Sequence, residues 1–243
     1  MSVRATALAD SRGLVADACR VLAARGLADG FLGHISLRVD PERVLIRCRG
    51  PRERGLAWTT PDDIRLVDLD GAAGGPGELD DGWSPPNELP LHTEILRSRT
   101  DDVAVVHAHP AAVVAADLAG LAIRPIVGSF DIPGTKLAAG GVPVYQRGVL
   151  VNSRTLASEV VAAMAGRPAV VMRGHGLTTA GSSVQEAVLR AVSVDVLARL
   201  SLQVVSAGGR LVDLPAEDLA QLPDLGAGFN EGVAWRHEIS RLG

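Results

Sequence analysis

Two histidines separated by one residue stand at the end of an apolar run. Residues 103–106 (Val-Ala-Val-Val) are β-branched or small and predict a buried strand. His107 and His109 lie at the end of this strand. Side chains at positions i and i+2 of a strand point to the same side, so we expect both imidazoles on one face. Paired imidazoles at a strand end are typical ligands of a transition-metal ion.

A third histidine and one carboxylate are candidates to complete such a site. His175 lies between two glycines after the apolar segment 169–172, so its ring can face a cavity. Glu88 opens a helix expected over residues 88–99; the helix dipole favours a carboxylate there, so plain helix capping is the alternative explanation. Glu94 is a competing carboxylate. Three imidazoles leave a coordination position open on a catalytic metal, and a carboxylate commonly joins them. The predicted metal ligands are Glu88, His107, His109 and His175.

Helices and strands alternate along the chain in a pattern typical of an α/β protein. The expected helices cover residues 11–24, 88–99, 111–118, 155–164 and 182–206, and the expected strands cover 34–39, 44–48, 64–69, 103–109, 125–127, 142–145 and 169–172. Segment 71–84 is rich in Gly, Asp and Pro and predicts a surface loop. No internal repeat or linker is visible, so we expect one domain over residues 1–243, with 208–243 as a less regular C-terminal tail.

Composition limits the classes of protein to which the chain can belong. Its 243 residues are 47% hydrophobic but only 3% aromatic, which fits one α/β domain with an aliphatic core. A net charge of −4 argues against a general nucleic-acid binder. No apolar run is long enough to predict a membrane span, and the N-terminal residues lack the apolar stretch of a signal peptide. Two cysteines make no disulfide framework, so we expect a cytoplasmic protein.

At these residues the chain resembles the class II aldolase/adducin family. The shared marks are Gly33-x-x-Ser36 with Arg38 after it, Thr60-Pro61-x-Asp63, the Asp68-x-Asp70-Gly71 turn, Glu88, His107-x-His109 and Gly174-His175-Gly176. The resemblance spans residues 10 to 205 and implies an α/β fold of three layers, α/β/α, with a mainly antiparallel central sheet. It also implies a homotetramer with active sites at subunit interfaces. The four predicted ligands match the family's metal-site positions, and in the aldolases the glutamate can also act as an acid or base.

The chain departs from the sugar-phosphate aldolases where they hold phosphate. Those enzymes use a Gly-Asn pair, a Thr/Gly-rich turn and a Ser-Ser pair, whereas this chain has His34, an arginine-rich turn over 49–54 and Pro86-Asn87. A phosphate cradle needs small residues with free backbone N–H groups, and proline has none. The pattern resembles instead the decarboxylase branch, which acts on hydroxylated aromatic or heteroaromatic carboxylates. An arginine can bind such a carboxylate bidentately, with Arg49 preferred, although a solvated basic loop is the alternative.

The resemblance and the residues together predict a metal-dependent carbon–carbon lyase. We expect a decarboxylase of a hydroxylated aromatic or β-oxo/hydroxy carboxylate that works through a metal-stabilised enolate. Glu88 and His34 are the expected catalytic residues, Ser36 and Arg49 the expected substrate-binding residues, and His92 a packing or supporting residue. The expected cofactor is a divalent metal, zinc or manganese first, with cobalt or iron as alternatives.

Three other functions stay open at this point. The first is a class II aldolase or epimerase that acts on a small hydroxy-carbonyl substrate. The second is a non-catalytic, adducin-like interaction module, and the third is a non-haem iron oxygenase on the same fold. The expected partners are a small-molecule carboxylate and further copies of the chain, with neither nucleic acid nor membrane.

Overall fold

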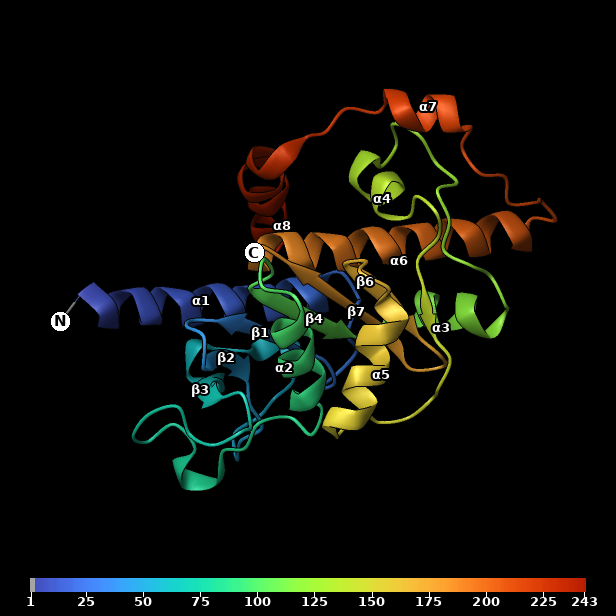
Figure 1. Cartoon of the computed structure of the whole chain (residues 1–243). Coiled ribbons are helices and arrows are strands. Elements are labelled where there is room, and N and C mark those ends of the chain that lie inside the picture. Colours follow the sequence, from blue (N-terminus) through green and yellow to red (C-terminus); the bar gives the residue numbers. More distant parts are fainter. Residues whose placement is uncertain (1–2) are drawn as a thin grey trace.

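Seven strands form one sheet in the order β3-β2-β1-β4-β7-β6-β5 in this computed structural model, which describes residues 3–243 (Figure 1). In chain order the strands are β1 (His34–Arg38), β2 (Arg43–Arg47), β3 (Ile64–Asp68), β4 (Ala104–Ala108), β5 (Val144–Tyr145), β6 (Ala169–Met172) and β7 (Gly176–Gly181). Neighbouring strands are antiparallel except β5 and β6, which run parallel. The expected mainly antiparallel sheet is therefore confirmed.

Helices cover both faces of this sheet. They are α1 (Val3–Ala24), α2 (Leu89–Ser98), α3 (Ala111–Leu118), α4 (Ile132–Leu137), α5 (Arg154–Met164), α6 (Val184–Ser206), α7 (Ala216–Gln221) and α8 (Trp235–Ser240). Shorter 3₁₀ turns cover Leu56–Trp58, Pro61–Asp63 and Asp80–Gly82, and a π-helical turn covers Gly228–Ala234. Apolar side chains of α1, α3 and α6 pack on one face, and those of α2 and α5 pack on the other (Figure 1). The result is the expected three-layer α/β/α architecture.

Strand β4 lies in the middle of the sheet and shows how the two layers divide its side chains. Ala104, Val106 and Ala108 belong to the core under α1 and α6, while Val105 belongs to the core under α2 and α5. Because strand side chains alternate between faces, His107 points to the α2 and α5 side. Burial on both faces also explains why the strand reads as a continuous apolar run rather than an alternating one.

Local signals set the ends of several helices. Ser153 and Ser183 are the N-cap residues of α5 and α6, and their hydroxyls accept hydrogen bonds from Leu156 N and Glu186 N. After α1 the chain turns at Gly26, whose φ of +69° favours glycine. These short-range contacts explain why the predicted helix boundaries agree with the observed ones to within a few residues, except at the longer N-terminus of α1.

The predicted element map missed strand β7 and helices α4, α7 and α8, and it placed a strand over 125–127. Strand β7 was missed, although Thr178 and Thr179 are β-branched, because glycines bound the segment at both ends. Helix α4 was also missed within a Gly- and Pro-containing stretch. No strand forms over 125–127, where Pro125 lacks a backbone N–H for a sheet and its carbonyl accepts from Leu214 N in the tail.

The C-terminal segment 208–243 folds back onto the body of the protein (Figure 1). Trp235 of α8 is buried in the core under α1 and α6, and the guanidinium of Arg25 donates to the buried carboxylate of Glu238 at 2.6 Å. Between residues 3 and 243, no helix combines the length and the apolar character needed to cross a bilayer. The single domain over residues 1–243, with 208–243 as its C-terminal tail, and the cytoplasmic location stay predictions.

Candidate metal centre

His107 is held by β4 with one ring nitrogen free. It pairs across the sheet with His34 of β1 and with Thr178 of β7. Its Nδ1 lies 3.0 Å from both the carbonyl oxygen of Leu177 and the hydroxyl of Thr178. A carbonyl oxygen can only accept, so Nδ1 carries the proton and Nε2 keeps its lone pair. This is the tautomer that a metal ligand on Nε2 requires.

His109 and His175 bring two more rings to the same place. Nε2 of His109 lies 2.8 Å from Nε2 of His107. His175 comes from the turn between β6 and β7, where the following Gly176 lies so close to β4 that a Cβ atom there would stand 2.3 Å from the carbonyl oxygen of Ala108. Only glycine permits this approach, which places the His175 turn beside the end of β4.

Glu88 supplies a carboxylate from the start of α2. It occupies the N-cap position but makes no capping hydrogen bond. Its Oε1 accepts instead from the backbone N–H of Val151 at 3.0 Å, and its Oε2 lies 3.3 Å from Nε2 of His107 and 3.8 Å from Nε2 of His175. The side chain therefore faces the histidines, and helix capping does not explain its position.

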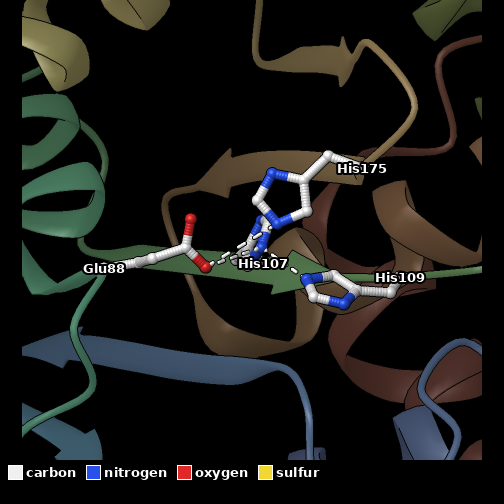
Figure 2. Close-up of side chains that lie close together, drawn as sticks. All are labelled: Glu88, His107, His109 and His175. Atoms are coloured by element: carbon white, nitrogen blue, oxygen red, sulfur yellow. Dashed lines mark hydrogen bonds and ion pairs between the residues drawn. The ribbon is translucent and has the colours of Figure 1, made fainter. Parts of the chain in front are cut away.

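The four side chains converge on one small space. One donor atom from each of Glu88, His107, His109 and His175 lies within 4.8 Å of all the others (Figure 2). Nε2 of His107, which carries no proton, lies 2.8 Å from Nε2 of His109 and 3.3 Å from a carboxylate oxygen of Glu88, an arrangement that a cation would stabilise. Three imidazoles with one carboxylate also form a usual donor set for divalent transition metals. The residues present could therefore hold a divalent metal ion.

Burial and mutual contact keep this cluster ready to bind a cation. Burial, then the neighbouring His107 and His175, lower the pKa of His109 to about 3, and burial followed by His107 lowers the pKa of His175. Burial alone would raise the pKa of Glu88, but the neighbouring His107 and the hydrogen bond from Val151 N–H lower it to about 2. At neutral pH His109 and His175 are therefore neutral and Glu88 is ionised, and ligands in these states need not lose a proton when metal binds.

A cavity of about 430 Å³ opens beside the cluster. Glu88, His109 and His175 line it together with His34 and Arg49. The exposed apolar side chains of Phe31, Leu32 and Leu150 also border it. The cavity thus brings together a candidate metal centre, the guanidinium of Arg49 and an apolar wall. These are the features needed to hold a small aromatic carboxylate.

Arg49 shares its charge with a neighbour that the sequence interpretation missed. Its guanidinium donates to Glu53 at 2.5 Å and to the carbonyl oxygen of Phe31 at 2.7 Å. Buried Arg47 donates to the same Glu53 oxygen at 2.6 Å. Two guanidinium groups therefore meet one carboxylate, which leaves a net positive charge at this wall of the cavity. The spacing of Arg49 and Glu53 by four residues was the available sequence signal.

His34 and Ser36 differ in their access to the cavity. His34 is buried but lines the cavity, and its Nε2 lies 3.7 Å from Oε2 of Glu88. Ser36, predicted to bind substrate, is fully buried and does not line the cavity; its hydroxyl lies 2.8 Å from Nδ1 of His92. In this structure Ser36 therefore contacts His92 and does not reach the cavity. His92 is fully buried, in agreement with its interpretation as a packing or supporting residue.

Comparisons with known proteins agree with this arrangement. Two relatives named 3,4-dihydroxyphthalate decarboxylase are similar over almost the whole chain. The protein from Terrabacter sp. (strain DBF63) is 76% identical over 97% of this chain and 98% of its own length. The protein from Arthrobacter keyseri is 68% identical over 96% of this chain and 94% of its own.

A solved structure shows the same fold at much lower identity. L-fuculose 1-phosphate aldolase from Glaciozyma antarctica PI12 superposes with a TM-score of 0.78 at 19% identity, covering 100% of this chain and 93% of the other. The family model of the Class II Aldolase and Adducin N-terminal domain matches residues 13–202. The chain therefore belongs to the class II aldolase and adducin N-terminal domain family, as the resemblance of its motifs predicted.

Proposed function

We propose that this protein is a divalent-metal-dependent decarboxylase of 3,4-dihydroxyphthalate or a closely similar dihydroxylated aromatic dicarboxylate. The observation that carries the proposal is the cavity in which the metal-type donor set meets Arg49 and an apolar border. The near-full-length similarity to two proteins named for this reaction supports it. The wall over 85–87 is Pro-Pro-Asn, which offers few backbone N–H groups for a phosphate.

In this proposal Glu88, His107, His109 and His175 hold the metal ion. A bound divalent cation would supply Lewis acidity to a phenolic oxygen of the substrate. Zinc or manganese is the proposed occupant, since mixed imidazole and carboxylate sites suit both.

Arg49 would hold a substrate carboxylate. A guanidinium binds a carboxylate through two parallel N–H groups, and Glu53 limits how many of these are free before substrate arrives. Phe31, Leu32 and Leu150 would contact the faces and edge of the aromatic ring, because they border the same cavity.

His34 is proposed to handle the proton. Decarboxylation breaks the bond between the ring carbon and the carboxyl carbon, and CO2 leaves while the electron pair remains on the ring. That ring carbon must then gain one proton. Nε2 of His34 lies beside Glu88 at the cavity, which is where a donor to the substrate is needed.

An assay with matched substrates tests the proposal. Purified protein, stripped of metal and reloaded with zinc or manganese, should release CO2 from 3,4-dihydroxyphthalate and form a dihydroxybenzoate. Phthalate lacks the hydroxyl groups and should not react, and 3,4-dihydroxybenzoate, one of the two possible products, should not lose CO2 in turn. Cleavage of a sugar phosphate without CO2 release from any of these acids would contradict the proposal in favour of an aldolase. Failure to retain metal under any loading condition would favour a non-catalytic module.

A homotetramer is the second part of the proposal. Phe31 is 58% exposed and Leu150 48% exposed beside the cavity, so a neighbouring subunit that covered them would also close the site. Light scattering on the metal-loaded protein should give the mass of four chains. A mass of one chain at working concentration would contradict this assembly.

A further inference from the structure

Three buried side chains form a hydrogen-bonded chain that ends at the cavity. The hydroxyl of Ser36 lies 2.8 Å from Nδ1 of His92, and Nε2 of His92 lies 2.7 Å from Nδ1 of His34. Ser36 and His92 are fully buried, and His34 is 3% exposed. Residues 34 and 36 come from β1 and His92 from α2, so sheet and helix hold the chain at both ends.

The protons in this chain can be arranged in two directions. Two ring nitrogens 2.7 Å apart hold one proton between them, so either His92 donates to His34 or His34 donates to His92. In the first arrangement His34 carries its own proton on Nε2 and presents a donor to the cavity. In the second it presents a lone pair there, as Nε2 of His107 does.

The surroundings of His34 favour the first arrangement. Its Nε2 lies 3.7 Å from the carboxylate oxygen Oε2 of Glu88, which attracts a proton on that nitrogen and repels a lone pair. A hydroxyl group rotates freely, so Ser36 can donate to Nδ1 of His92. His92 then donates from Nε2, and His34 accepts at Nδ1. Both protons between the three side chains have an acceptor in this arrangement, and the Nε2 proton of His34 is left to face the cavity.

We infer that Ser36 and His92 are positioning residues that hold His34 with its proton on Nε2, aimed at the substrate in the cavity. The inference rests on the proposed function for the role of that proton. It also gives a reason why His34, whose ring centroid is 5.1 Å from that of His107, would serve as a donor and not as a fourth imidazole ligand. Ser36 therefore affects the substrate through two intervening rings.

Nitrogen NMR of the histidine rings tests the inference without any catalytic assay. In the zinc-loaded, ¹⁵N-histidine-labelled protein, two-bond ¹H–¹⁵N correlations separate a protonated Nε2 from a protonated Nδ1. The His34 signals, assigned by their loss in His34→Gln, should show a protonated Nε2. Ser36→Ala removes the first donor and should give a mixture of the two His34 tautomers. A His34 ring with its proton on Nδ1 in the unsubstituted protein would overturn the inference.

Kinetics on matched variants supply a second readout. Ser36→Ala and His92→Leu should each lower kcat about 10- to 100-fold, the usual effect of losing a residue that orients a site group, with metal content and KM little changed. His92→Gln keeps an amide donor for His34 and should recover most of the loss seen in His92→Leu. Equal losses in the Gln and Leu variants, or full kcat in Ser36→Ala with a pure Nε2–H tautomer, would overturn the inference.

The two readouts separate this inference from the proposed function. Unfolding curves and metal content show whether each variant folds, and Ser36→Cys, which keeps a weaker donor, replaces Ser36→Ala if the latter is unstable. A protein that shows the expected His34 tautomers but releases no CO2 from dihydroxyphthalate would refute the proposed function and leave the positioning role standing.

Discussion

Replacing His92 should flatten the pH dependence of the free energy of unfolding. Burial, followed by the nearby His107, lowers the pKa of His92 from 6.5 to about 3. The folded ring therefore stays neutral at a pH where the unfolded ring takes up a proton. Because the folded pKa is the lower one, the stability tied to this ring is complete above pH 6.5 and is lost as the pH falls towards 3.

The size of the effect follows from the two pKa values. Within that window each pH unit changes the free energy of unfolding by about 1.4 kcal/mol for one proton. Integrated from pH 6 to pH 4, the loss due to His92 is about 2.5 kcal/mol. His92→Gln cannot titrate, so the variant should lose about 2.5 kcal/mol less than the unsubstituted protein over this range, whatever its stability at pH 7.

Urea unfolding of the metal-free protein at pH 6, 5 and 4 measures this difference, with tryptophan fluorescence as the signal. His237→Gln is the matched control, because it removes an exposed histidine of α8 where His92→Gln removes a buried one. The same pH dependence in His92→Gln and in the unsubstituted protein would refute the reasoning. It would mean that His92 is protonated in the folded state or that the region opens before global unfolding.

Three further substitutions test the site. Glu88→Gln keeps an acceptor for Val151 N–H but removes the negative charge, so metal content measured by mass spectrometry should fall at least about 10-fold. Arg49→Met should raise KM for the dicarboxylate about 10- to 100-fold, which corresponds to the free energy of one hydrogen bond to a charged group, and should change kcat less. An unchanged KM would exclude Arg49 from substrate binding. Gly176→Ala places a Cβ atom 2.3 Å from the carbonyl oxygen of Ala108. The free energy of unfolding, measured with urea, should fall by about 1–3 kcal/mol, and less metal should be retained. An unchanged free energy of unfolding would show that the turn adjusts.

Much of the candidate metal centre could be predicted from the sequence. The period of a strand places His107 and His109 on one side, and flanking glycines indicate that His175 sits in a turn. The start of a helix made Glu88 the candidate carboxylate, the family resemblance supported it and added the order of layers, and the fold and the family are confirmed. The part played by these residues in binding metal stays a prediction, since it depends on an experiment with the ion.

Other features could not be predicted because they depend on contacts between distant segments. Glu88 could equally have capped α2; the hydrogen bond to Val151, 63 residues away, turns its carboxylate towards the histidines. Ser36 belongs to a motif that suggested substrate binding, yet packing of α2 on β1 places it against His92, 56 residues away. The missed strand β7 likewise depends on its antiparallel pairing with β4.

The sequence by itself thus determined the types of donor and their local spacing, because strand period, turn residues and helix starts are short-range properties. Only the tertiary structure decided which donors meet and which way they face. Strand register sets His34 opposite His107, and the packing of α2 on the sheet brings His92 between Ser36 and His34. Register and packing arise from the burial of many side chains at once, and no single stretch of residues encodes them.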